Sequence, residues 1–175
     1  GVKPCGSRMT LSRFCSIASY GDLIYVITGN GVDETWLKVT APEAPSVICF
    51  KKGSGEVVWH DNSPGANILT GQWSSPLVIA TGERAQVVVP QGDGWLRSFD
   101  ALTGKLNWKF DINPKTSTTD TYGRGERNTI TATPVYDDGR VYIAGGNYAE
   151  FGEGPGRLVC IDPSKTGDIS SELAV

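Results

Sequence analysis

A β-hairpin is encoded by residues 95–108, which are Trp95-Leu96-Arg97-Ser98-Phe99-Asp100-Ala101-Leu102-Thr103-Gly104-Lys105-Leu106-Asn107-Trp108. Apolar or aromatic residues alternate with polar ones up to Phe99 and again from Leu106, which is the pattern of two strands. Between the strands, Asp100 can bond its own downstream backbone, and Gly104 can adopt a positive φ. These residues predict two antiparallel strands joined by a short, sharp turn.

Copies of this pattern occur on both sides of the hairpin. The earlier copy is Cys49-Phe50-Lys51-Lys52-Gly53-Ser54-Gly55-Glu56-Val57-Val58-Trp59. The later and weaker copy is Leu158-Val159-Cys160-Ile161-Asp162-Pro163-Ser164-Lys165-Thr166-Gly167. A supersecondary unit that recurs about every 40–50 residues is typical of the blades of a β-propeller.

The central hairpin resembles the tryptophan-docking motif of the quinoprotein-like, or PQQ-like, propeller repeat family, whose pattern is A-x-D-x-x-T-G-x-x-x-W. The residues that match are Ser98, which replaces the usual Ala, Asp100, Thr103, Gly104 and Trp108. In the earlier copy the matching residues are Cys49, Gly55 and Trp59, and Lys51 stands where the motif has Asp. In the later copy they are Cys160, Asp162, Thr166 and Gly167, after one inserted residue and without the Trp.

The resemblance implies an all-β fold built from four-stranded antiparallel blades. The length of 175 residues suits about three such blades, whereas a closed ring needs about four or more. We therefore expect a partial propeller, either a piece of a larger protein or a ring that another chain completes. In this fold Trp59 and Trp108 are structural residues that lie flat between neighbouring blades.

The repeat order divides the chain into four segments. Residues 1–14 form an irregular N-terminal segment, and residues 15–73 form the first blade-like repeat. Residues 74–130 form the second repeat together with a long inter-blade loop, and residues 131–175 form an incomplete third repeat.

Charge and hydropathy argue against two classes of partner. The chain carries 16 Lys and Arg against 19 Asp and Glu, a net charge of −3, and it has no concentrated basic face of the kind that binds nucleic acid. A run of about 18 apolar residues, which a membrane-spanning helix needs, does not occur.

The four cysteines, at positions 5, 15, 49 and 160, form no CxxC or CxxCH arrangement, so metal, dithiol and haem-attachment sites are not indicated. Cys49 and Cys160 occupy equivalent repeat positions and are expected to be buried free thiols. A disulfide between Cys5 and Cys15 is the alternative use of the remaining pair.

Candidate binding residues lie in the connections that propellers gather on one face. They are Asn30, Asp33, Glu34, Asp93, Arg124, Arg127, Asn147 and Glu150. Carboxylate and amide oxygens can hold Ca²⁺, and an arginine can pair with a ligand carboxylate. The alternative is that these residues are turn formers, because Asp, Asn and Gly are common in turns for conformational reasons alone.

The family resemblance leaves three functions open. The first is a binding or scaffolding propeller in the periplasm or another extracytoplasmic compartment of a bacterium, with further blades or another protein chain as partner and a small molecule as a ligand of the funnel. The second is part of a PQQ- and Ca²⁺-dependent alcohol or sugar dehydrogenase. The third is a subunit of an electron-transfer assembly. The first is favoured, because the chain has no adjacent cysteine pair and no Asp that maps onto the catalytic residue of the quinoproteins.

Overall fold

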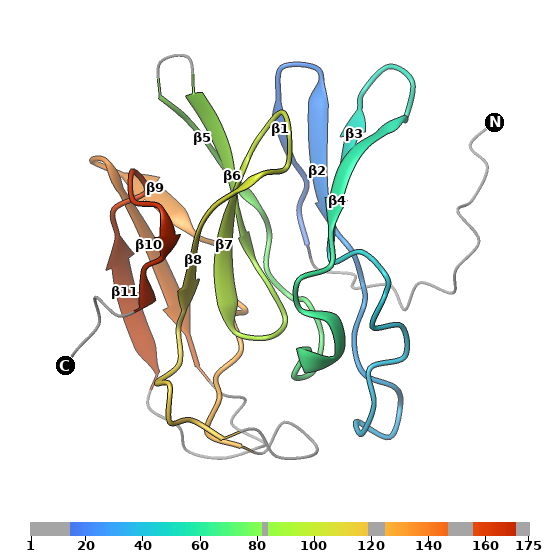
Figure 1. The fold of residues 1–175 in the computed structure, drawn as a ribbon, viewed down its shortest axis with the longest axis vertical. Coiled ribbons are helices and arrows are strands. Elements are labelled where there is room, and N and C mark those ends of the chain that lie inside the picture. Colours follow the sequence, from blue (N-terminus) through green and yellow to red (C-terminus); the bar gives the residue numbers. More distant parts are fainter. Residues whose placement is uncertain (1–14, 82–83, 119–124, 147–155, 171–175) are drawn as a thin grey trace.

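The computed structural model describes residues 15–81, 84–118, 125–146 and 156–170, and in these ranges the chain is almost entirely β-structure. Three sheets stand side by side, each contributing one layer (Figure 1). The predicted all-β class is confirmed. Among the described residues, no helix combines the length and apolar character that crossing a bilayer requires.

The first sheet, called here the first blade, has four antiparallel strands in chain order. They are β1 (Ala18–Tyr20), β2 (Leu23–Ile27), β3 (Val47–Lys51) and β4 (Val57–Asp61). A long connection, residues 28–46, joins β2 to β3, and a 3₁₀ turn, η1 (Gly65–Asn67), follows β4.

The second blade repeats this order and adds one strand at its outer edge. Its strands are β5 (Leu77–Thr81), β6 (Arg84–Pro90), β7 (Trp95–Asp100) and β8 (Leu106–Asp111), with β12 (Gly167–Asp168) parallel to β8. The third blade has three described strands, β9 (Val135–Asp137), β10 (Arg140–Gly145) and β11 (Arg157–Ile161). The first strands of successive blades are neighbours, β1 beside β5 and β5 beside β9.

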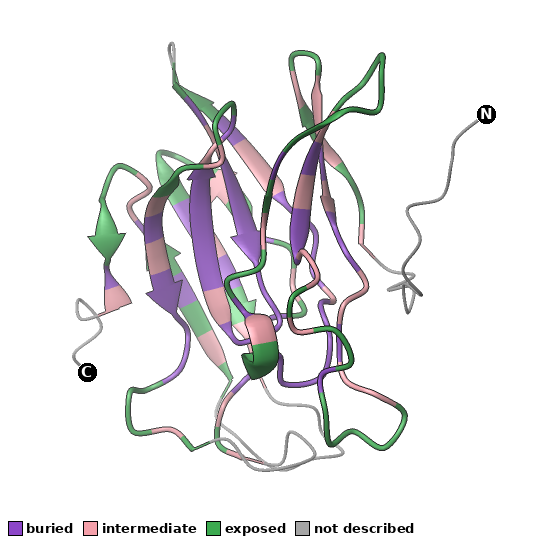
Figure 2. Cartoon of the chain, turned by 45° about the vertical axis from the view of Figure 1, so that its right-hand side comes forward, coloured by how far each residue is buried: buried purple, intermediate pink, exposed green. Residues whose placement is uncertain are grey.

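The core consists of two apolar layers, one on each face of the second blade. Val87 and Val89 of β6 face the first blade, whereas Val88 faces the third. Both faces of this strand are buried, which explains its continuous apolar sequence. Buried residues therefore concentrate on the strands of the middle sheet (Figure 2). The hairpin turns at 52–56 and 102–105 are largely exposed, whereas the connection 68–76 is largely buried.

Each of the two motif tryptophans contacts the following repeat. The indole N–H of Trp59 donates to the carbonyl oxygen of Ala101 at 3.0 Å, and a Cβ on Gly104 would lie only 2.7 Å from the Trp59 ring. The indole N–H of Trp108 donates to the carbonyl oxygen of Pro163 at 3.2 Å and to Oε1 of Gln86 at 3.1 Å. Their contribution to stability stays a prediction.

The turn residues of the motif act within their own hairpin. Oδ1 of Asp100 accepts bonds from the amides of Leu102 and Thr103 and from the Thr103 hydroxyl. Ser98 is fully buried, and its hydroxyl donates to Oε1 of Gln86 at 2.5 Å. Gly55 has a φ of 70°, as a left-handed turn position requires.

The third copy of the hairpin differs from its predicted form. After the Thr166-Gly167 turn the chain does not return along β11; instead Gly167 pairs with Trp108 on β8 of the second blade. The physical reason is burial, since Ile169 lies in the apolar layer between the second and third blades, and its amide donates to the carbonyl oxygen of Lys109 at 3.0 Å.

A hydrogen bond joins the segments that precede β5 and β9. β5 starts at Leu77 and β9 at Val135. The hydroxyl of Ser74 donates to the carbonyl oxygen of Ala132 at 2.6 Å.

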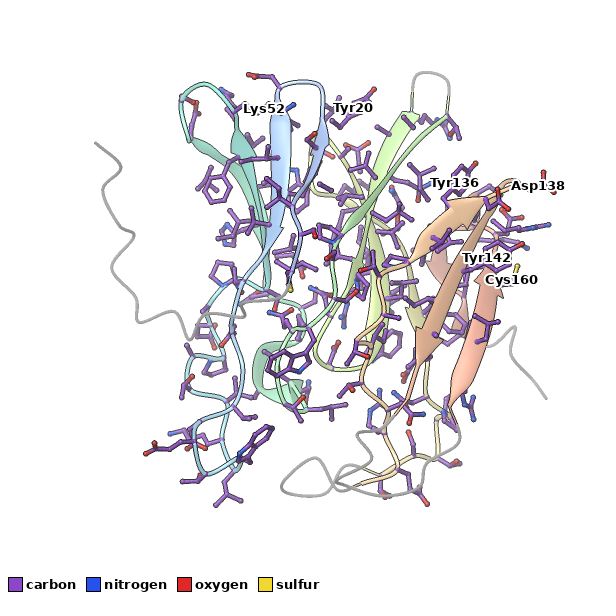
Figure 3. All side chains as sticks on the ribbon, turned by 180° about the vertical axis from the view of Figure 1, so that it is seen from behind. Tyr20, Lys52, Tyr136, Asp138, Tyr142 and Cys160 are labelled. Atoms are coloured by element: carbon purple, nitrogen blue, oxygen red, sulfur yellow. The ribbon has the colours of Figure 1, made fainter. Side chains whose placement is uncertain are left out.

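The expected burial of Cys160 is corrected by the structure. Cys49 is fully buried by the second blade, whereas Cys160 is exposed on the outward face of the third blade, where no described residue covers it. Figure 3 shows Cys160 beside Tyr142, its partner in the β10–β11 register, and the neighbouring thiol raises the pKa of Tyr142. Cys5 lies outside the described residues, so its pairing with Cys15 stays a prediction.

Candidate functional site

A pocket of about 640 Å³ lies between the first and second blades. It lies at the end of the sheets where the long connections gather, and Figure 1 shows these connections in its lower part. One wall comes from the β2–β3 connection and from the segment around η1. The other wall comes from the adjoining ends of β7 and β8 and from the segment before β9. We call this cavity the inter-blade pocket.

The charged wall contains a buried ion pair on β7 and the turn before it. Nη2 of Arg97 lies 2.8 Å from Oδ2 of Asp93, and Nη1 lies 3.0 Å from Oδ1, so the contact is bidentate. The two side chains are only 8% and 6% exposed. Bidentate geometry compensates much of the cost of removing both charges from water, and it fixes both side chains in place.

Gln91 extends this pair across the blade interface. Its Oε1 accepts a bond of 2.6 Å from Nη1 of Arg97, and its Nε2 donates to Oδ2 of Asp61, on β4, at 2.8 Å. The first and second blades are thus joined by a hydrogen-bonded network at the base of the inter-blade pocket.

A second ion pair adds a residue from the long connection before β9. Nη2 of Arg127 lies 2.8 Å and 3.0 Å from the two carboxylate oxygens of Asp111, at the end of β8. The same nitrogen donates to the carbonyl oxygen of Asp93 at 3.2 Å. Gly94 beside this pair permits the close packing of Asn113, because a Cβ there would lie 2.5 Å from Nδ2 of Asn113.

The remaining cation of the charged wall is Lys109, on β8. Its Nζ lies 4.7 Å from the centroid of the Trp95 ring, a cation–π distance. Its nearest carboxylate, that of Asp168 on β12, is 3.8 Å away, and both side chains are well exposed, at 37% and 43%. Water therefore screens this contact far more than it screens the two arginine pairs.

The opposite wall is apolar and is shaped by a local loop structure. Oδ1 of Asp33 accepts bonds from the Thr35 hydroxyl at 2.7 Å and from the amides of Thr35 and Leu37. The Thr35 hydroxyl, followed by the loop amides, holds the pKa of Asp33 below its usual value. Trp36 then has a φ of 63°, a strained value for an aromatic residue, and its side chain lines the pocket.

The structure separates the predicted site residues. Asp93 and Arg127 line the inter-blade pocket, whereas Asp33 and Glu34 line a smaller neighbouring pocket of about 270 Å³. Asn30 holds its own connection, because its Nδ2 donates to the carbonyl oxygen of Ala41 at 2.9 Å. Arg124, Asn147 and Glu150 lie outside the described residues. Whether any of these residues binds a ligand stays a prediction.

Three charged residues of the pocket were missed in the sequence, namely Arg97, Lys109 and Asp111. They sit in strands, whereas the sequence predicts binding residues in the connections between strands. One signal was available, since Arg97 shares its strand face with Trp95 and Phe99, and a charge on an otherwise buried face calls for a partner.

The described residues do not fit the calcium shell of a quinone site. No group of three or more His, Cys, Asp or Glu side chains in the described ranges is placed to hold a metal ion. The carboxylates of Asp93 and Asp111 are already bonded to Arg97 and Arg127, and Ca²⁺ would have to displace these arginines.

Comparison with known proteins gives a family and a fold. A family model described as outer membrane protein assembly factor BamB matches residues 10–173. No protein with a curated description matches the chain.

Solved structures with the same fold include three dehydrogenases. A quinohemoprotein alcohol dehydrogenase from Comamonas testosteroni is 23% identical with a TM-score of 0.59, and the alignment covers 91% of this chain and 20% of that one. One from Pseudomonas putida HK5 is 22% identical, with a TM-score of 0.54 and the same coverage. A europium-containing methanol dehydrogenase is 19% identical with a TM-score of 0.50, covering 87% of this chain and 23% of that one. The chain thus spans about a fifth of the length of these enzymes, and the similarity confirms the partial propeller.

Proposed function

Because the chain belongs to the PQQ-like propeller repeat family described as outer membrane protein assembly factor BamB, we propose that it is a binding and scaffolding module that works outside the cytoplasm. The extracytoplasmic location rests on this family description. The proposed partners are further propeller blades or another protein chain, with a small molecule bound between the blades.

The observation that carries the proposal is the state of the two buried carboxylates in the inter-blade pocket. Arg97 holds the Asp93 carboxylate in a bidentate contact, and one nitrogen of Arg127 bonds to both carboxylate oxygens of Asp111. A polar wall whose groups already satisfy one another is rigid before any ligand arrives, which favours recognition. It leaves no open carboxylate shell for a catalytic cation.

Exposed apolar side chains support a role in assembly. On the third blade Leu158 is 78% exposed and Val135 is 58% exposed, and Ile17, directly before β1 of the first blade, is 63% exposed. Sheet faces of this kind are covered elsewhere in the same chain by the next blade, so a further sheet is the partner that best matches them.

The competing function is that of a quinoprotein dehydrogenase, because the solved structures with this fold are such enzymes. An activity assay distinguishes the binding module from the dehydrogenase. PQQ and Ca²⁺ are added to the purified protein, and the dye-linked oxidation of alcohols and aldoses is followed. We expect no quinone-dependent turnover, and a native mass that protein alone accounts for. Turnover that requires PQQ, or a native mass that includes the quinone and calcium, would overturn the proposal.

The third function, a subunit of an electron-transfer assembly, predicts a haem absorbance in the purified complex. A complex without this absorbance supports the binding module, whereas a haem-carrying partner at stoichiometric amount supports the assembly.

A further inference from the structure

We infer that the inter-blade pocket binds a small organic anion, a carboxylate attached to an apolar body, with the carboxylate at Lys109 and the apolar body against the first blade. The inference rests on the proposed binding function and names the class of ligand. It depends on a contrast between the two walls of the pocket.

The wall from the first blade offers apolar surface that stands in water. Leu37 is 53% exposed and Trp36 is 40% exposed, and both line the pocket beside the buried Ile68. Figure 2 shows η1 just below the strands, beside the β2–β3 connection. The strained backbone of Trp36 holds its indole at this place, and backbone strain of this kind is retained where the side chain has a task. An apolar ligand body would cover both side chains.

The wall from the second blade carries three cations, which differ in how strongly they are paired with carboxylates. Of its three cations, Arg97 and Arg127 are bonded to buried carboxylates at 2.8 Å. Lys109 has one carboxylate contact among the described residues, the screened one with Asp168 at 3.8 Å, beside its cation–π contact with Trp95. An incoming anion would therefore find Lys109 able to bind it without breaking a buried ion pair.

The same wall disfavours a cationic ligand. The acidic residues that line the pocket are Asp93 and Asp111, and both are already paired with arginine. A cation would have to displace Arg97 from its bidentate contact with Asp93, or Arg127 from both carboxylate oxygens of Asp111. The lining thus carries one more positive than negative charge.

The position of Lys109 suits a carboxylate at the edge of the cavity. Its ammonium lies 4.7 Å from the centroid of the Trp95 ring, which keeps it on the pocket wall instead of free in solvent. A volume of about 640 Å³ falls in the range of small-molecule sites. Lys109 and Leu37 both line this cavity, so a ligand that fills it would contact the charged and the apolar wall together.

Isothermal titration calorimetry with matched probes tests this assignment. The probes are 2-naphthoate, its neutral analogue 2-naphthamide, and octanoate as an aliphatic carboxylate, at neutral pH and low salt. We expect both carboxylates to bind, and 2-naphthamide to bind about ten-fold more weakly than 2-naphthoate. Equal binding of the acid and the amide, or no binding of either carboxylate at about 10 mM, would overturn the inference.

Two variants locate the site. Lys109→Gln should weaken 2-naphthoate about ten-fold and leave 2-naphthamide unchanged, whereas Leu37→Ser should weaken both about five-fold. The matched controls are Lys105→Gln and Leu102→Ser, which alter exposed side chains on the β7–β8 turn, outside the pocket. Circular dichroism checks that each variant is folded. Wild-type affinity of Lys109→Gln for 2-naphthoate would contradict the site.

A failure of the inferred ligand class can be distinguished from a failure of the proposed function. If no carboxylate binds and PQQ with Ca²⁺ also gives no turnover, the ligand class is wrong and the binding module stands. If PQQ restores turnover, the proposed function fails whatever the naphthoate titration shows.

Discussion

Trp59 and Ala101 meet across the interface of the first and second blades, where the indole N–H donates to the carbonyl oxygen at 3.0 Å. The same carbonyl oxygen accepts a second bond, also 3.0 Å long, from the hydroxyl of Tyr25. Ala101 is fully buried, so both lone pairs of its carbonyl are satisfied by the preceding blade. This bonding ties the hairpin of one repeat to the strands of the repeat before it.

The shared acceptor predicts non-additive mutations. Tyr25→Phe should cost about 1 kcal/mol in the free energy of unfolding, because one bond to Ala101 remains. Trp59→Phe should cost more, because it also removes part of a buried ring and leaves a cavity. The double variant leaves the carbonyl oxygen buried without a partner and should cost about 1 kcal/mol more than the sum of the single changes. Urea denaturation of the four proteins measures the coupling. Strict additivity would show that the two bonds are independent.

Substitution of Gly104 should lower the free energy of unfolding more than substitution of an ordinary turn glycine. Its φ is 72°, and a Cβ there would lie 2.7 Å from the Trp59 ring. Gly104→Ala should therefore cost about 3 kcal/mol or more, from backbone strain together with overpacking. Gly55→Ala is the matched control, since Gly55 has a φ of 70° and nothing within 4 Å of the added Cβ. It should cost about 1 kcal/mol. Equal urea midpoints for the two variants would argue against the packing role of Gly104.

Truncation of Trp108 should greatly lower the free energy of unfolding, because it removes a whole side chain from between two blades. Its side chain is fully buried, and its indole N–H bonds to Pro163 of the third repeat. Trp108→Ala should cost about 3–5 kcal/mol, measured by urea or thermal denaturation. Leu102→Ala, at a position 59% exposed, should change stability by less than about 0.5 kcal/mol. A wild-type midpoint for Trp108→Ala would refute the structural role of this residue.

The fold was predictable because its signals are local. The alternation around Phe99 and the Asp100–Gly104 turn each depend on a few neighbouring residues, and the structure contains the hairpin that they indicate. The repeat of this pattern was enough to identify the family. The prediction of the third hairpin was wrong because the path after Gly167 depends on long-range contacts. It is decided by the burial of Ile169 against residues distant in sequence.

The site was less predictable, because its geometry is long-range. The sequence predicts Asp93 and Arg127 as binding residues in connections, and both line the inter-blade pocket. Nothing in the sequence indicates that Gln91 bridges Arg97 to Asp61, since that contact spans two repeats. Nor does a lysine within a strand reveal that its ammonium lies over Trp95.

Cys49 predicts a loss of stability at alkaline pH. Burial raises the pKa of its thiol to about 11, from 9.0 in an exposed cysteine. Between these values the unfolded chain releases a proton that the folded protein keeps, so the unfolding free energy falls as the pH rises from about 9 to 11. Burial raises the pKa of Tyr25 as well, which adds to the loss at the upper end of this range.

The contribution of the thiol is measured with Cys49→Ala, which introduces the residue usual in the motif. Urea midpoints at pH 8 and pH 10.5 should fall further in the wild type than in the variant. A drop of the same size in both proteins would mean that Cys49 does not titrate in this window.

The outward face of the third blade predicts self-association of the isolated chain. Leu158 and Val135 are 78% and 58% exposed, and they lie on a sheet whose opposite face is packed against the second blade. When another sheet covers an apolar face of this kind, apolar surface leaves water and the association is stabilised. Sedimentation velocity should therefore show an average mass that rises with protein concentration. Leu158→Asp should shift the distribution toward the monomer, whereas Leu102→Asp, on an exposed turn, should not. A sharp monomer boundary at every concentration would contradict the role assigned to this face.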